Sequence, residues 1–503
     1  HAQKIPLPNT MPLLTTLLLM PMLGAGWILL QRGGNAQKRT VAILFSGLTL
    51  VIALLVLALF DHNNTAIQFS ETMVWNARMG TSYAVGIDGI ALSMVLLATL
   101  LVFVAILASG TIQKQVSGYY ALILFLESAM IGVFIARDWA LFYVFWEMTL
   151  IPLFFLIDRW GGVRRSRAAL NFVLYTMGGS VFMLISLLVL FDAMPDHSFS
   201  MAAMTETART LPASTQLFLF LGFLVGFGVK MPIFPLHGWL PLAHVEAPAP
   251  ISILLSGILL KMGAYGLILA SSMLPLAILE LQTELMVLAL LGLIYGGLLA
   301  WRQSDLKSMV AYSSVSHMGV VLFGISTLNI AGLTGAVFQM VAHGLVAGAL
   351  FLLIGLLYQR THTRNINDYR SLIDVAPRFA LFTSLALFGA IGIPGSAGFI
   401  AEFHAIVGGF ERWGWITILL SLGVMISASY AVRTLGVLFT GPSSPRMAQV
   451  QDLNRSELSA AAVLILLMLW IGLYPTPALE MLELSIQQML YTPTLISSAG
   501  GAL

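Results

Sequence analysis

The 503-residue sequence contains no cysteine, and only 9% of its residues are charged. The absence of cysteine excludes iron–sulfur ligation, thiolate zinc sites, disulfides and cysteine nucleophiles in this chain. No glycine-rich nucleotide fingerprint follows a strand-like run, and no basic run with interleaved aromatic residues indicates binding to nucleic acid. Soluble globular proteins carry roughly 25% charged residues. A chain that is 58% hydrophobic therefore needs lipid as its solvent.

Long apolar runs fill most of the chain. About fourteen windows reach the length of roughly 20 residues that a helix needs to cross the hydrocarbon core, and they predict an all-α membrane protein. These windows are 11–31, 40–60, 87–108, 117–136, 138–157, 167–192, 215–236, 250–274, 283–301, 305–326, 330–358, 377–409, 415–440 and 456–473. No small-residue cleavage site follows the first window, so we interpret it as a membrane span. The chain begins at His1, and Met11 is a candidate native start.

Two windows contain residues that break helices. The seventh contains Pro232 and Pro235, and the twelfth contains Pro394 and Gly395. These predicted breaks lie five helices apart, so helices 4–8 and 9–13 are candidates for two copies of one five-helix unit. An odd-numbered unit repeated in tandem must insert upside down the second time, which is typical of inverted-repeat transporters. A chance similarity of two Gly/Pro clusters is the alternative.

This repeat predicts a division of the chain into four parts. Residues 1–110 hold helices 1–3, residues 111–275 the first repeat, residues 276–440 the second repeat, and residues 441–503 helix 14 with a C-terminal tail. Most Lys and Arg residues of the loops lie in odd-numbered loops. Cytoplasmic loops are enriched in Lys and Arg, so we predict that the odd loops are cytoplasmic and that both termini lie on the other side.

Several ionisable residues lie inside the predicted helices, where a charge costs at least about 2.5 kcal/mol. They are Glu127, Glu147, Lys230, Lys261, Lys307, His317, His343 and Glu402. Burial lowers the pKa of lysine and raises that of glutamate in general, so such groups can exchange protons near neutral pH. We interpret them as a proton relay. The alternatives are a static Glu147–Lys230 ion pair, histidines that serve only in packing, and a Lys307 that extends to a surface.

Two further histidines follow the first predicted break. His237 and His244 are seven residues apart, and only Glu246 could complete a metal site with them. We therefore predict no metal site, and favour structural hydrogen bonding or part of a water path for these side chains.

Six motifs between about residues 85 and 410 are highly specific when taken together. They are VGIDGIAL at 85–92, ARDWALFYVFWEMTLIPLFFLI at 136–157, GVKMPIFPLHGWLPLAHVEAPAP at 228–250, GILLKMGAYGL at 257–267, SDLKSMVAYSSVSHMG at 304–319 and IPGSAGFIAEF at 393–403. The chain resembles the antiporter-like subunit M, or chain 4, of proton-pumping NADH:quinone oxidoreductase (complex I). The photosynthetic counterpart of this subunit is the NdhD-type subunit of the NAD(P)H dehydrogenase-like complex. The resemblance implies fourteen helices with two inverted five-helix repeats.

The resemblance also implies roles for the buried ionisable residues. Glu147 resembles the acid of helix 5 that pairs with Lys230, and Lys261 resembles the central lysine of helix 8. His317 and His343 match histidines near the central hydrophilic axis of the family. These positions imply a proton path through the middle of the chain.

One position favours a subtype, and another departs from the family pattern. Glu402 matches a terminal acid that leads protons outward, whereas the related L and N subunits and the Mrp-type subunits usually carry lysine there. Glu402 therefore favours subunit M. Leu242 stands where the family usually has an acid. This loss indicates a specialised paralogue, such as a CO2-uptake variant of the photosynthetic complex.

The resemblance implies a proton-translocating subunit of a redox-driven NAD(P)H or ferredoxin:quinone oxidoreductase. No redox chemistry is then expected in this chain, and flavin, iron–sulfur clusters and quinone, including plastoquinone, would belong to partner subunits. L- and N-type antiporter-like subunits would be its neighbours, in a bacterial inner membrane or a thylakoid membrane. The alternatives are a subunit of an Mrp-type cation/proton antiporter, the membrane arm of an energy-converting hydrogenase, and a purely structural membrane scaffold.

Overall fold

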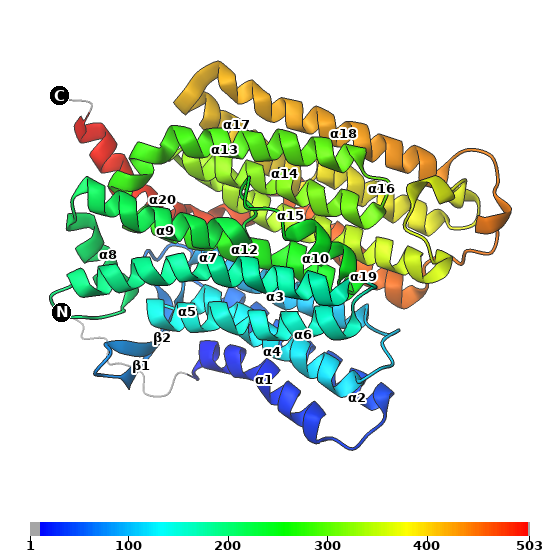
Figure 1. The fold of residues 1–503 in the computed structure, drawn as a ribbon, viewed down its shortest axis with the longest axis horizontal. Coiled ribbons are helices and arrows are strands. Elements are labelled where there is room, and N and C mark those ends of the chain that lie inside the picture. The colour runs from blue at the N-terminus through cyan, green and yellow to red at the C-terminus, as the bar shows by residue number, and fades with distance from the viewer. Residues whose placement is uncertain (1–10, 501–503) are drawn as a thin grey trace.

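The computed structural model of the protein describes residues 11–500, so the question of a native start within residues 1–10 lies outside it. Long helices lie side by side along the longest axis of the molecule (Figure 1). The helices of the first half are α1 (Leu13–Leu30), α2 (Asn35–Leu59), α3 (Gly89–Leu107), α4 (Val116–Ile135), α5 (Trp139–Met148), α6 (Leu150–Trp160), α7 (Arg165–Ala193), α8 (Met201–Thr210), α9 (Ala213–Lys230), α10 (Leu240–Glu246), α11 (Ala249–Leu254) and α12 (Leu260–Met273). Those of the second half are α13 (Pro275–Arg302), α14 (Leu306–Ser326), α15 (Ile330–Thr361), α16 (Pro377–Ile391), α17 (Ala397–Trp413), α18 (Ile418–Phe439), α19 (Arg455–Leu473) and α20 (Thr476–Gly500).

Thirteen segments of the described chain are long and apolar enough to cross a membrane. One of them, Ala397–Phe439, is 43 residues long and combines α17 with α18. Gly414 separates these two helices with a φ of 67°, a conformation that glycine adopts without steric cost. Each predicted window coincides with one such segment except at 377–409 and 415–440, where the windows divide α16, α17 and α18 differently: 377–409 covers the shorter helix α16 and most of α17, and 415–440 covers α18. The predicted all-α membrane fold with about fourteen spans is confirmed, whereas the inverted repeats and the domain boundaries stay predictions.

The structure breaks spans seven and twelve where the sequence predicts. Helix α9 ends at Lys230 and α10 begins at Leu240, with Pro232 and Pro235 in the turns between them. Helix α16 ends at Ile391 and α17 begins at Ala397, with Pro394 and Gly395 between them. Proline has no backbone N–H to continue a helical hydrogen-bond ladder, which explains why both helices stop here.

Two further interruptions were not predicted. Span five divides at Thr149 into α5 and α6, and Pro152 lies one turn further on, where it cannot donate a hydrogen bond to the carbonyl of Met148. Span eight contains one π-helical turn, η1 (Leu255–Leu259), between α11 and α12. Such turns occur often at functional sites, and this one ends two residues before Lys261.

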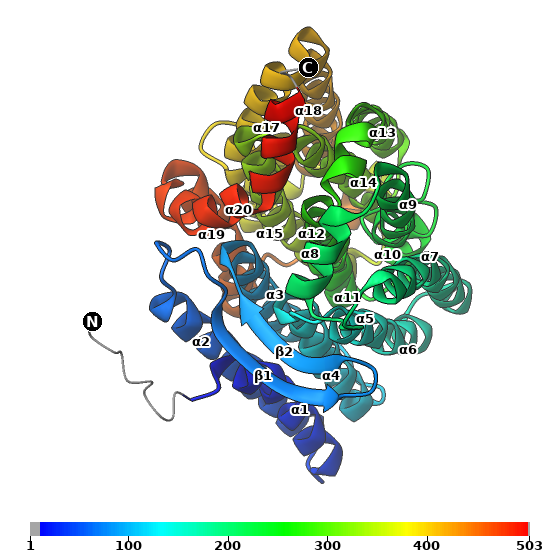
Figure 2. The same cartoon turned by 90° about the vertical axis from the view of Figure 1, so that its left-hand side faces the viewer.

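One end of the molecule carries elements that the apolar windows do not reveal. Strands β1 (Gln68–Asn76) and β2 (Thr81–Ile87) form an antiparallel hairpin in which Met73 lies opposite Tyr83. The segment expected as a C-terminal tail contains the helix α20, and the hydroxyl of Ser485 accepts a hydrogen bond of 2.7 Å from the N–H of Gly89 at the start of α3. Figure 2 shows the hairpin, α8 and α20 lying across this end. We call it the hairpin end.

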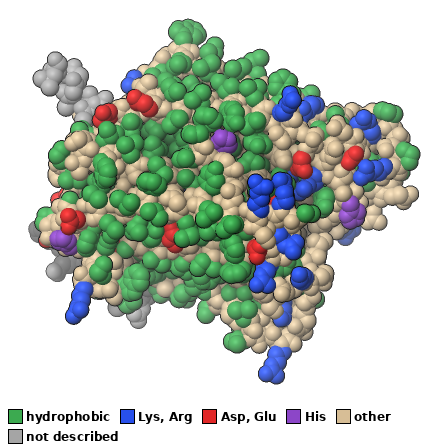
Figure 3. Space-filling view, in the orientation of Figure 1, with side chains coloured by type: hydrophobic (Ala, Val, Ile, Leu, Met, Phe, Trp, Pro, Cys, Tyr) green, Lys and Arg blue, Asp and Glu red, His purple; other side chains and the backbone are tan. Residues whose placement is uncertain are grey.

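Charge is distributed unevenly between the two ends. Figure 3 shows Lys and Arg side chains gathered toward the end opposite the hairpin, while apolar side chains cover the middle of the visible face. An apolar band of this kind suits lipid contact. The gathering of positive charge agrees with the predicted orientation, in which the hairpin end is non-cytoplasmic; the sidedness itself stays a prediction.

Candidate functional site

Lys261 lies fully buried in the middle of span eight. Its ammonium nitrogen Nζ lies 2.6 Å from the carbonyl oxygen of Ser256 and 2.5 Å from Nδ1 of His343. Ser256 belongs to the π-helical turn, whose wider backbone leaves carbonyl groups available to a side chain. The local distortion of span eight therefore provides one of the two partners that hold Lys261.

His343 joins Lys261 to α14. Its Nε2 lies 3.2 Å from the hydroxyl oxygen of Ser314, which in turn lies 2.7 Å from the hydroxyl of Ser256. An ammonium group can only donate hydrogen bonds. When Lys261 is charged, Nδ1 of His343 must therefore accept, and the proton of the neutral ring lies on Nε2, directed at Ser314.

His317 continues this line toward the second half of the chain. Its ring centroid lies 5.4 Å from that of His343, and Nε2 of Gln339 lies 3.4 Å from its Nδ1. Nε2 of His317 is buried without a hydrogen-bond partner among the described residues. A histidine with one unpartnered ring nitrogen beside a small cavity can accept a hydrogen bond from a water or donate one to it.

Two small cavities separate His317 from Glu402, and both residues line both of them. Each cavity has a volume of about 10 Å³, close to the minimum space that one water requires. His343 and Gln339 line the second cavity as well. A single water in either space could therefore connect the histidine to the carboxyl group.

Glu402 lies on α17, shortly after the break in span twelve. A methyl group placed on Gly392 would come within 2.5 Å of its Oε2, so the carboxyl group packs against the backbone at the end of α16. Gly392 has a φ of 81° and forms the left-handed cap of that helix. The structure thus brings four predicted residues into one line inside the fold, which we call the central line: the buried Lys261, His343 and His317, and the partly buried Glu402.

Glu147 and Lys230 form a second group, at the interruptions of spans five and seven. Nζ of Lys230 donates a hydrogen bond of 3.2 Å to the hydroxyl of Thr149, and it lies 4.5 Å from the ring centroid of Trp146. Glu147 and Lys230 form no salt bridge within the described chain, but the two groups interact electrostatically. Oε1 of Glu147 is buried without a hydrogen-bond partner in the same region. Thr149 and Trp146 hold the ammonium in place of the carboxylate.

Lys307 and Glu127 lie outside both groups of contacts. Lys307 is buried and donates a hydrogen bond to the carbonyl of Ala247, which corrects the alternative that it extends to a surface. Glu127 is fully buried in α4, and neither of its carboxyl oxygens has a hydrogen-bond partner within residues 11–500. The ring of His244 stacks on Phe351 at 4.9 Å between centroids, and neither of its nitrogens has a hydrogen-bond partner in the described chain, so the structural hydrogen bond favoured for it is not formed.

The sequence reasoning missed the polar neighbours that connect the ionisable residues. Each of these neighbours contacts a predicted site residue: Ser256 contacts Lys261, Ser314 contacts His343, Gln339 contacts His317 and Thr149 contacts Lys230. Ser314 and Gln339 precede His317 and His343 by three and four residues, a spacing that places each pair on one helical face. This spacing in the sequence is the signal that indicates both polar residues.

Residues 136–427 match the family described as the NADH:quinone oxidoreductase/Mrp antiporter transmembrane region. The chain belongs to this family. It is 36% identical over 489 residues to NADH-quinone oxidoreductase subunit M of Rickettsia conorii, with 95% of this chain and 99% of the relative covered. It is 39% identical over 483 residues to NAD(P)H-quinone oxidoreductase chain 4 1 of Picosynechococcus, with 92% and 89% covered.

Solved structures of family members share the fold. The chain superposes on a chain of respiratory complex I from Thermus thermophilus with a TM-score of 0.87 and 30% identity, covering 95% of this chain and 99% of that one. A chain of the Mrp complex from Dietzia gives a TM-score of 0.86 at 18% identity, with 97% and 99% covered, and shows the fold alone. These relatives identify an antiporter-like membrane subunit of the complex I type.

Proposed function

We propose that this chain translocates protons through its interior as a membrane-arm subunit of an NAD(P)H or ferredoxin:quinone oxidoreductase. The observation that carries the proposal is the central line, in which Lys261, His343, His317 and Glu402 follow one another inside the fold. Ionisable groups inside a membrane are costly and typically mark proton pathways. A series of such groups, connected through small cavities and ending beside an interrupted helix, can support proton passage.

Electron transfer would belong to other subunits of the complex. The sequence has no cysteine to hold an iron–sulfur cluster, so we assign flavin, iron–sulfur clusters and quinone to partners. L- and N-type antiporter-like subunits are the expected neighbours, and the chain would act as part of the enzyme without redox chemistry of its own. Relatives of both the bacterial and the cyanobacterial type support either an inner or a thylakoid membrane.

Glu402 favours this role over that of an Mrp-type antiporter subunit, for which the family resemblance implies lysine at the same position. A carboxylate can take up a proton from a protonated histidine, directly or through a water, and release it again. A lysine at this position would suit a different coupling arrangement. The acid therefore fits the last proton-exchanging group of the central line.

The proposal is tested by Glu402→Ala, with Glu402→Asp as the conservative variant. In the assembled complex, Glu402→Ala should lower the initial rate of proton pumping into vesicles about tenfold or more, and Glu402→Asp should retain part of it. Glu411→Ala is the matched control, because Glu411 is an exposed acid on the same helix. Native gels report assembly. An assembled Glu402→Ala complex that pumps at the rate of the unaltered protein would remove Glu402 from the proton path.

A further inference from the structure

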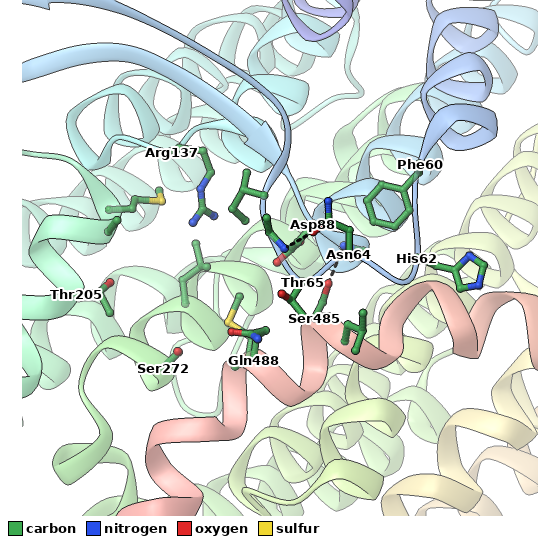
Figure 4. A pocket seen from close by; sticks show the side chains of 18 of the residues that line it. Phe60, His62, Asn64, Thr65, Asp88, Arg137, Thr205, Ser272, Ser485 and Gln488 are labelled. Atoms are coloured by element: carbon green, nitrogen blue, oxygen red, sulfur yellow. Dashed lines mark hydrogen bonds between the residues drawn. The ribbon is translucent and has the colours of Figure 1, made fainter. Parts of the chain in front are cut away.

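A large cavity of the described chain lies at the hairpin end, away from the central line. Its volume is about 570 Å³, far above the roughly 10–15 Å³ that one water occupies. Its polar lining includes Asp88, Arg137, Glu206, Arg209 and Ser272. Figure 4 shows Arg137, Thr205 and Ser272 around one space, which α20 borders with Ser485 and Gln488. A space of this size with a charged lining is expected to be filled with water.

Helix α12 runs from the central line to this cavity. Lys261, Tyr265 and Leu269 follow one another at intervals of four residues and therefore lie on one helical face. Leu269 and Ser272, near the end of the helix, line the cavity. Eight residues of helix span about 12 Å, so roughly two helical turns separate Lys261 from the water in the cavity.

Tyr265 occupies the middle of this short distance. Its side chain is fully buried, and its hydroxyl donates a hydrogen bond of 3.2 Å to the carbonyl of Phe134. It also interacts electrostatically with Asp88 and Arg137, both of which line the cavity. The proposed central line gives no task to this hydroxyl. Its position between the buried Lys261 and the charged groups that line the cavity suggests a role in proton transfer.

We propose that the cavity is a water-filled vestibule and that Tyr265 gates a second proton path between it and Lys261. This path rests on the proposed function, because it makes Lys261 a branch point between Glu402 and the vestibule. A tyrosine hydroxyl can accept one proton while it donates another. The ammonium of Lys261 gives a proton through a bridging water to the hydroxyl oxygen, and the hydroxyl proton leaves to vestibule water.

In this exchange Lys261 becomes a neutral amine and the vestibule gains one proton, so charge is balanced. The hydroxyl donates to the carbonyl of Phe134 in this structure, and that arrangement keeps the path closed. Rotation of the hydroxyl away from this carbonyl and toward the cavity opens it. The vestibule would then release protons at the hairpin end, where the charge distribution predicts the non-cytoplasmic side.

The first experiment tests whether water reaches the cavity. Because the chain contains no cysteine, one introduced thiol is unique in this subunit. Ser272→Cys places a thiol on the cavity wall. Ser271→Cys is the matched control, since Ser271 is buried and its hydroxyl bonds the carbonyl of Leu267. In the full complex, a membrane-impermeant maleimide added at the hairpin end should label Ser272→Cys and leave Ser271→Cys unlabelled. No labelling of Ser272→Cys overturns the vestibule.

The path itself is tested by Tyr265→Phe, which keeps the ring and removes the hydroxyl. Proton pumping by the assembled complex should fall about threefold to tenfold, the range of a lost proton-transfer group. Tyr119→Phe is the control, because Tyr119 is equally buried and its hydroxyl lies 2.7 Å from that of Ser109. Tyr119 lies near the start of α4, whereas Tyr265 contacts Phe134 near the end of that helix. Unchanged pumping in Tyr265→Phe overturns the second path.

The two proposals fail in different ways. If Glu402→Ala lowers pumping and Tyr265→Phe does not, the proposed function stands and the second path is wrong. If both variants pump like the unaltered complex, the proposed function itself is wrong. If both lower pumping and Ser272→Cys is labelled, Lys261 serves two routes.

Discussion

The breaks in spans seven and twelve interrupt helices in similar ways but treat their ionisable residues differently. Lys230 is the last residue of α9, where the helix dipole favours a cation. Thr149 and the face of Trp146 hold its ammonium as well. Glu402 follows its break, packs against Gly392 and lines two small cavities. At the break in span seven the ammonium of Lys230 is held in place by its contacts. At the break in span twelve the carboxyl group of Glu402 lies beside cavities that can hold water.

This difference suggests that the two halves have different roles: an electrostatic role for Lys230 and proton exchange for Glu402. A positive charge held by three separate contacts biases the neighbouring groups electrostatically and has little freedom to move. A carboxyl group beside small cavities can exchange its proton with whatever occupies them. Lys261 lies between the two regions and contacts His343 directly. We therefore expect variants at Lys261 to have the largest effects, and variants at the two breaks to separate the two roles.

Lys261→Arg should have the largest effect of all. Arginine keeps the positive charge but does not release a proton in proteins, and its planar group must fit where Ser256 and His343 now hold an ammonium. The rate of proton pumping should fall about a hundredfold in the assembled complex. Lys114→Arg, at an exposed loop lysine, is the control. Retained pumping in Lys261→Arg would show that only a fixed charge is needed here.

Glu147→Gln should have the next largest effect. Glu147 interacts electrostatically with Lys230 but forms no salt bridge with it in the described chain, and Thr149 and Trp146 still hold the ammonium when Glu147 is replaced. We expect the complex to assemble and its proton pumping rate to fall about tenfold. The measurement compares assembly on native gels with pumping in vesicles, and Glu284→Gln, at an exposed acid of α13, serves as the control. Loss of assembly before loss of pumping would favour a structural role.

The sequence was sufficient to predict the spans and the two breaks, because hydrophobic length and proline each act locally. The interruption at Thr149 was also visible in principle, since Pro152 lies inside an apolar window. The π-helical turn was not visible. A methyl group on Gly257 would lie 2.3 Å from a methyl carbon of Leu101, so this turn packs closely against α3. Such a contact between distant segments leaves no periodic pattern in either one.

The contacts of the site were harder to predict than its members. The sequence identified Lys261, His317, His343 and Glu402, because ionisable residues are rare within membrane spans. It could not show that Lys230 donates its hydrogen bond to Thr149. Thr149 is the single residue between α5 and α6, and this interruption of span five determines which side chain faces the ammonium. The helix α20 was missed for a different reason. It carries Glu480 and Glu483, so it does not form a long apolar window.

Gly392→Ala should have the smallest effect, and it examines the second break directly. Gly392 has a φ of 81°, so alanine there costs roughly 1–2 kcal/mol of backbone strain. The added methyl group would also come within 2.5 Å of Oε2 of Glu402 and must displace the carboxyl group. We expect the pumping rate of the assembled complex to fall about threefold.

Gly414→Ala separates strain from displacement. Gly414 also has a positive φ, of 67°, but a methyl group on it would meet no atom within 4 Å. Both variants should lower the thermal stability of the complex, and only Gly392→Ala should lower its pumping rate. Equal losses of pumping would mean that backbone strain near α17 is enough to disturb transport. A loss confined to Gly392→Ala would show that the position of the Glu402 carboxyl group, set by the glycine that caps α16, limits the rate of proton release.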